Sequence, residues 1–191
     1  MAPHINSVVR TCYSHIRQIA HIRPFLTRGA AATLTNTIVT SRLDYVNSLL
    51  IGLPKCSFRK LELVQNNAAR MVCMKKKRDH VTPLLESLHW LPVEYRVRFK
   101  VNMLTYKALH GLTPQYLSSL LTPYTPSRNL RSSSQGLLQE KRTKCKAGER
   151  AFSVCAPKLW NALPNSVRAS GSYVSFKKSL KTHYFRLAFT V

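Results

Sequence analysis

The stretch INSVVRTCYSHIRQIA, residues 5–20, carries the pattern that decides the fold class. Its apolar side chains recur at steps of three and four residues, which is the spacing of one helix face: Ile5, Val8, Val9, Cys12, Ile16 and Ile19. We expect Asn6 or Ser7 to cap this helix and Pro24 to end it, because proline cannot continue a helix. The chain therefore opens with a predicted amphipathic helix.

Two further helices are predicted before residue 75. The second begins at a Thr27 cap and ends at Gly52 and Pro54, and its apolar residues keep mostly to one side: Ala31, Leu34, Ile38, Tyr45 and Leu49. The third opens at Ser57, and its apolar stripe consists of Leu61, Val64, Ala68, Met71 and Val72. Three helices with short connections predict a small helical bundle.

The rest of the chain is also predicted to be mostly helical. Helices are expected from Thr82-Pro83, from Pro92 to Gly111, from Thr113-Pro114 to Leu121, from Pro157 to Leu163, and after a Ser172 cap. Between them, 137–146 and 150–155 alternate weakly and predict a short β-hairpin that turns at Ala147-Gly148. The predicted fold class is mostly α: a small helical bundle, then a second helical region with this hairpin near the C-terminus.

Composition divides the chain into four segments. Residues 1–75 form the three-helix region, and residues 76–121 form a basic helical region. Residues 122–136 are rich in Ser and Pro and read as a linker. Residues 137–191 form a basic C-terminal subdomain.

Charge limits the kinds of partner and of chemistry. The chain has 30 lysines and arginines against 7 aspartates and glutamates, a formal charge of +23, and a sequence pI of about 10.5. Such an excess favours a polyanion as the partner. The five cysteines form no Cys-x-x-Cys pair, which is typical of a reduced protein in the nucleus or cytosol. No run of about 18 apolar residues predicts a membrane span, and the first residues do not predict a signal peptide.

Three groups of basic residues are the candidate contacts with RNA or DNA. They lie in the run after the third helix, along the predicted helix 92–111 and along the last helix: Lys75, Lys76, Lys77, Arg78, Arg96, Arg98, Lys100, Lys107, Lys177, Lys178, Lys181 and Arg186. Such groups bind the phosphate backbone with little sequence preference. The alternative is that each run is a solvated face or a localisation signal. Trp90 and Trp160 are predicted to be packing anchors rather than base-stacking residues.

No catalytic or metal site is predicted. Two-metal catalysis needs converging carboxylates, and the only aspartates are Asp44 and Asp79. Cys12 and His15 lie one helical turn apart, but a tetrahedral zinc site needs a second pair of ligands. A Cys–His nucleophile pair would need a third, orienting group. We therefore expect neither a metal nor another cofactor, and no catalysis by this chain alone.

Seven phrases stand in one order along the chain. They are SRLDYVNSLLIGLP (41–54), VQNNAAR (64–70), HWLPV (89–93), YKALHGLTP (106–114), RSSSQG (131–136), APKLWNALP (156–164) and FKKSLKTH (176–183). Together they resemble the C-terminal region of reverse transcriptases from non-LTR, LINE-type (jockey-like) retrotransposons.

The resemblance implies a fold and a role. Residues 1 to about 75 would correspond to the helical thumb of such a polymerase, and the remainder to its post-thumb tail. The family's catalytic Tyr-x-Asp-Asp motif belongs to a palm domain upstream, and this sequence does not contain it. The expected function is therefore that of a nucleic-acid-binding fragment without the palm. The alternative is a non-catalytic structural module that docks on a protein such as a palm domain.

Overall fold

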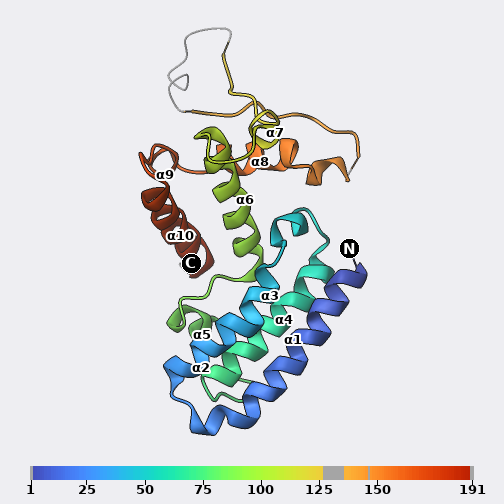
Figure 1. Ribbon diagram of the computed structural model, residues 1–191, viewed down its shortest axis with the longest axis vertical. Helices are drawn as coiled ribbons and strands as arrows, with labels where there is room; N and C mark the ends of the chain where they lie inside the picture. Colours follow the sequence, from blue (N-terminus) through green and yellow to red (C-terminus); the bar gives the residue numbers. More distant parts are fainter. Residues whose placement is uncertain (1, 127–135, 146, 190–191) are drawn as a thin grey trace. The chain divides into compact units, whose positions relative to one another are not determined.

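The computed structural model describes residues 2–126, 136–145 and 147–189, and these are mostly helical, as predicted (Figure 1). The chain divides into two compact units. Among the described residues, unit 1 combines those up to Asn47 with Leu53–Arg96, and unit 2 combines Ser48–Gly52 with those from Val97 onward. The boundary thus falls inside helix α6 (Val93–Leu109). The four segments expected from composition stay a prediction.

Unit 1 is a helical bundle. Its helices are α1 (Ala2–Ile22), α2 (Arg28–Thr35), α3 (Ser41–Asp44), α4 (Lys55–Val72) and α5 (Thr82–Ser87). Helices α1 and α4 lie side by side, and α2 contacts both of them (Figure 1). The core between them is apolar and fully enclosed at its centre, where the side chains include Cys12, Ala31, Val39, Leu61, Val64, Ala68 and Val72.

Two helix starts precede their predicted positions. Helix α1 already includes Ala2 and Pro3, so neither Asn6 nor Ser7 is its cap. Proline in a first turn is tolerated because the amide that it lacks would have no partner there. Helix α4 begins at Lys55 directly after Pro54, and Ser57 lies within its first turn. Thr27, by contrast, is confirmed as the cap of α2, since its hydroxyl accepts the Ala30 N–H at 3.2 Å.

The single helix predicted from Thr27 to Gly52 is wrong. The chain instead forms α2, a π-helical segment (Asn36–Thr40), the short α3 and a 3-10 turn (Asn47–Leu50). Hydroxyl side chains donate to carbonyls one turn back, Thr35 to Ala31 at 2.7 Å and Thr37 to Thr33 at 3.1 Å. Such bonds compete with the regular ladder and bend helices. The spacing of apolar residues, on which the prediction of one helix rested, carries no information about these side-chain hydrogen bonds.

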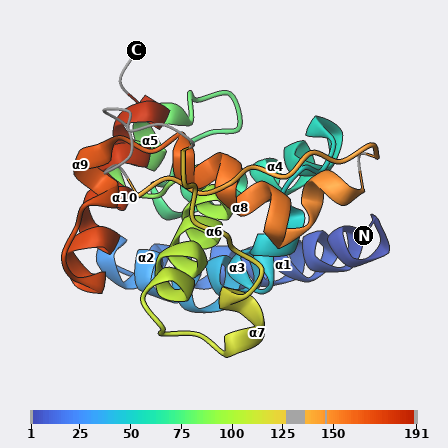
Figure 2. The ribbon, with the colours of Figure 1, turned by 90° about the horizontal axis from the view of Figure 1, so that it is seen from above.

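Unit 2 is built around a cluster of aromatic rings. Its helices are the part of α6 from Val97, α7 (Gln115–Ser118), α8 (Phe152–Asn161), α9 (Asn165–Arg168) and α10 (Tyr173–Phe189). The Tyr106 ring of α6 stacks on Phe176 of α10 at 4.3 Å between centroids and lies 6.5 Å from Trp160 of α8. Figure 2 shows α8 beside α6, with α9 leading into α10. Ser172 is confirmed as the cap of α10, because it accepts the Ser175 N–H at 3.2 Å.

The predicted β-hairpin is also wrong. Residues 137–145 contain no strand, and their ladder is limited to an isolated bridge from Leu138 to Pro123. Residues 150–155 instead end the 3-10 turn Gly148–Arg150 and open α8, five residues before the predicted start at Pro157. Val154, Pro157 and Trp160 are buried at helical spacing, so packing of α8 outweighs the weak alternation.

The described residues of the Ser- and Pro-rich stretch 122–136 lie within unit 2. Its residues 127–135 are outside the described ranges. The chain on either side is paired: the Tyr124 N–H donates to the Leu137 carbonyl at 2.9 Å, and the Gln139 N–H to the Thr122 carbonyl at 2.8 Å.

Candidate nucleic-acid interface

The run Lys75–Arg78 sits on a closed loop of unit 1. The loop leaves α4 through Met74, whose φ is +52°, and the Lys75 N–H donates to the Arg70 carbonyl at 2.9 Å. The carboxylate of Asp79 accepts the Lys76 N–H at 2.7 Å, and the Arg70 side chain donates twice to the Asp79 carbonyl, at 3.1 and 3.2 Å. All four basic residues of the run are exposed. The loop therefore holds four consecutive cations on a hydrogen-bonded backbone.

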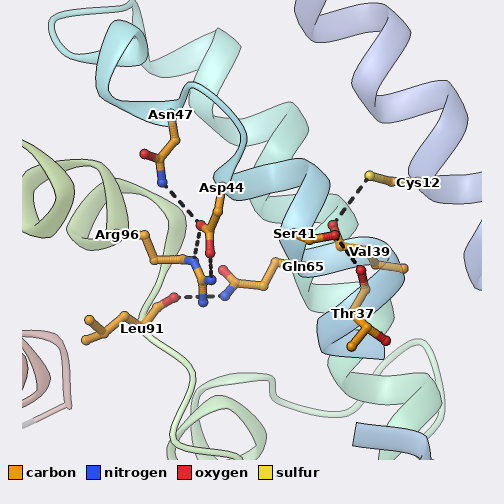
Figure 3. Close-up of polar contacts among 9 residues, drawn as sticks. All are labelled: Cys12, Thr37, Val39, Ser41, Asp44, Asn47, Gln65, Leu91 and Arg96. Atoms are coloured by element: carbon orange, nitrogen blue, oxygen red, sulfur yellow. Dashed lines mark hydrogen bonds and ion pairs between the residues drawn. The ribbon is translucent and has the colours of Figure 1, made fainter. Parts of the chain in front are cut away.

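Arg96 has a partner within unit 1. Its Nε donates to Asp44 Oδ1 at 2.8 Å, its Nη2 pairs with Oδ2, and the Asn47 amide donates to Oδ1 at 3.2 Å (Figure 3). The Arg96 side chain is 18% exposed and that of Asp44 is 39% exposed. Asp44 is thus a structural counter-ion. Among the predicted nucleic-acid contacts, Arg96 is one whose charge the protein itself already neutralises.

The remaining predicted contacts lie on α6 and α10 in unit 2. These helices pack together through the Asn102 amide, which donates to the Tyr184 hydroxyl at 2.7 Å. Lys107 lies over the Tyr173 ring, 4.8 Å from its centroid, so the structure brings it to the start of α10. Arg98 and Lys107 are half-buried, whereas the other predicted contacts on these helices are exposed: Lys100, Lys177, Lys178, Lys181 and Arg186. On α10 these cations flank a buried stripe of Phe176, Leu180 and Tyr184.

Several arginines outside the predicted set bind backbone carbonyls. Buried Arg23 donates to the Val72 carbonyl at 2.7 and 3.1 Å and to the Leu26 carbonyl at 2.7 Å. Arg168 donates to the Asn161 carbonyl at 3.0 Å, where α8 ends, and burial lowers its pKa. The guanidinium suits such sites because its planar fork offers several donors. Sequence reasoning missed these roles, although the shortage of acids is a signal that arginines must find other partners.

Cys12, from the Cys12–His15 pair, is part of the core of unit 1. Cys12 is fully buried, and its Sγ lies 3.9 Å from the Val39 carbonyl as a donor (Figure 3). Burial raises the pKa of Cys12 to about 11, so its thiol stays protonated at neutral pH. Within the described residues, no group of three or more His, Cys, Asp or Glu side chains is placed to hold a metal ion.

Both tryptophans are confirmed as packing anchors. Trp90 is buried in unit 1, and Trp160 is buried in unit 2, where its indole N–H donates to the Gly136 carbonyl at 2.9 Å. Trp90 is 5% exposed and Trp160 is 3% exposed, so the protein itself covers most of both rings. Among the helices of the described ranges, none combines the length and apolar character needed to cross a membrane.

No family profile, curated protein or solved structure matches this chain. The resemblance to LINE-type reverse transcriptases therefore rests on the seven quoted phrases.

Proposed function

We propose that this chain is a non-catalytic nucleic-acid-binding module that holds RNA or DNA by its phosphate backbone. The role agrees with that of the polymerase tail which the sequence resembles. The observation that carries the proposal is the closed loop after α4, with exposed cations at four consecutive positions, 75–78. Seven carboxylates can neutralise at most seven of the 30 basic side chains, so most of the charge needs an external counter-ion.

The closed loop favours a phosphate backbone over scattered counter-ions. Four adjacent cations repel one another, and a polyanion that binds them relieves this repulsion and releases its own condensed counter-ions. Since the loop backbone is already hydrogen-bonded, less conformational entropy is lost on binding than in an unordered run. Lysine side chains contact phosphates as point charges and read no base sequence.

Binding across a salt series tests the proposal. The full chain is titrated with a labelled single-stranded RNA, a DNA duplex and heparin between 50 and 200 mM salt. If six phosphates are contacted, affinity falls about a thousandfold over this range. Replacing Lys75, Lys76, Lys77 and Arg78 by glutamine should lower the slope of log affinity against log salt by about three.

The matched control removes four exposed charges elsewhere in unit 1, through Arg10→Gln, Arg17→Gln, Lys55→Gln and Arg59→Gln. It should lower the slope by less than the loop variant does. Equal losses would show that binding is diffuse rather than centred on the loop. Affinity that does not change with salt would contradict the proposed function as a whole.

A further inference from the structure

A groove lies in unit 1 between α1 and the end of α3. Its volume is about 480 Å³, which lies within the range of small-molecule binding sites. The residues that α1 contributes are three or four positions apart or adjacent, so they lie on one face of the helix. The opposite side of the groove is formed by α3 and its C-cap. The lining residues are His4, Ser7, Val8, Thr11, Ser41, Arg42 and Tyr45.

The groove is cationic. Among the described residues that line it none is acidic, and Arg42 is exposed. The charge of Arg42 also acts on α1. It lowers the pKa of Cys12 on that helix, against the larger effect of burial, which raises it. The neighbouring carboxylate of Asp44 is held by Arg96 and Asn47 instead. An anion in the groove would meet the Arg42 guanidinium together with the hydroxyls of Ser7 and Thr11.

One of the residues that line the groove has an exposed aromatic ring. Tyr45 is 70% exposed and has extended backbone at the C-cap of α3. The next residue, Val46, has a φ of +54°, so the chain turns sharply away from α3 at this point. Exposure of this large apolar ring to water is unfavourable, and the flat face of a nucleobase stacked on the ring would remove that exposure.

We propose that this groove binds one nucleotide of a single-stranded segment, with its phosphate at Arg42 and its base stacked on Tyr45. This inference rests on the proposed function and gives it a preferred substrate class. In a duplex each base is already stacked and paired, so its face is not available to Tyr45. Stacking on an aromatic ring tolerates every base, so no sequence preference is expected.

Four variants of the full chain test the groove: Tyr45→Ala, Tyr45→Phe, Arg42→Gln and, as the matched control, Arg17→Gln. Arg17 is exposed on α1 and is not among the residues that line the groove. Affinity is measured by fluorescence anisotropy for a 12-nucleotide single strand and for the duplex of the same sequence. Circular dichroism confirms that each variant is folded.

Tyr45→Ala should weaken single-strand binding about tenfold, because one stacked base is lost, and leave duplex binding within twofold. Tyr45→Phe keeps the ring face and should bind like the natural chain. Arg42→Gln should reduce the single-strand salt slope by about 0.7, and Arg17→Gln by less.

Equal effects of Tyr45→Ala on single strand and duplex would overturn the groove assignment, as would equal effects of Arg42→Gln and Arg17→Gln. Either result leaves the proposed function intact if the loop variant at 75–78 still loses its salt slope. Salt-independent binding by the natural chain would instead remove the proposed function itself.

Discussion

The carboxylate of Asp44 joins parts of unit 1 that are 52 residues apart, since it accepts the Nε–H of Arg96 and pairs with its Nη2 (Figure 3). Close by, the Gln65 amide donates to the Leu91 carbonyl at 2.8 Å and ties α4 to the chain before α6. These contacts involve three of the quoted phrases, 41–54, 64–70 and 89–93, together with Arg96. Asp44, which the sequence analysis considered only as a possible metal ligand, is a cross-link of the fold.

Replacing Asp44 by asparagine should destabilise the protein. The amide offers a single acceptor oxygen and no charge, so the largely covered guanidinium of Arg96 loses its counter-ion. We expect the free energy of unfolding to fall by about 1–3 kcal/mol, because both side chains keep some contact with water. Urea denaturation followed by circular dichroism measures the change. The control Glu86→Gln, at an exposed position, should change it by less than about 0.5 kcal/mol. Equal stability of the two variants would contradict a structural role for the pair.

At the scale of elements, three helices end in the same way. Helices α4, α5 and α6 are each followed by a residue with positive φ: Met74 (+52°), His89 (+54°) and Gly111 (+68°). The residue after each donates its N–H back into the last turn, from Lys75, Trp90 and Leu112, at 2.8 to 2.9 Å. This is the Schellman arrangement, which favours glycine at the left-handed position. Of the three positions, only Gly111 has the residue type from which the helix end could be predicted.

Glycine at position 74 should therefore stabilise unit 1. Met74 is 66% exposed, so the substitution loses little packing and removes the steric cost of a Cβ at positive φ. We expect Met74→Gly to raise the free energy of unfolding by about 0.5–1 kcal/mol, and the reverse change Gly111→Ala to lower it by about 1 kcal/mol. Thermal and urea unfolding of both variants check the opposite signs. Destabilisation by Met74→Gly would show that the thioether contributes more than the backbone strain costs.

Element types were largely predictable because helix periodicity and capping act over three or four residues. The caps Thr27 and Ser172 and the end at Gly111 were found in this way. The helix from Thr27 to Gly52 was not, because side-chain hydroxyls and the turn at Val46 interrupt it. The hairpin prediction failed for the opposite reason: burial of α8 outweighed a weak local alternation.

On the scale of the whole molecule, unit 2 includes a segment from within the first half of the chain, Ser48–Gly52. Arg150 holds it, by donating to the carbonyls of Ile51 at 3.2 Å and Leu49 at 3.0 Å. Gly52 has a φ of +69°, and a Cβ there would lie 2.9 Å from Arg150 Cγ. Sequence neighbours thus belong to different units because a contact 99 residues away decides their place.

Loss of this arginine should loosen the segment. We expect Arg150→Met to speed amide hydrogen exchange in peptides that cover Ser48–Gly52, since two carbonyls lose their donor while the apolar stem is kept. The control is Lys158→Met, an exposed position on α8, which should leave these peptides unchanged. Exchange in Ser48–Gly52 that is the same in both variants would contradict a structural role for Arg150. Hydrogen exchange followed by mass spectrometry makes this comparison.

The sequence by itself determined the mostly helical class, several helix ends and the large cationic excess, because periodicity, capping and charge are local or additive properties. Only the tertiary structure decided which cations remain available. It pairs Arg96 with Asp44, turns Arg23 and Arg150 onto carbonyls, and closes the loop that exposes Lys75–Arg78. It also forms the groove between α1 and α3 and sets the boundary inside α6. These features depend on contacts between residues far apart in the chain, whose partners are fixed by packing and not by spacing in sequence.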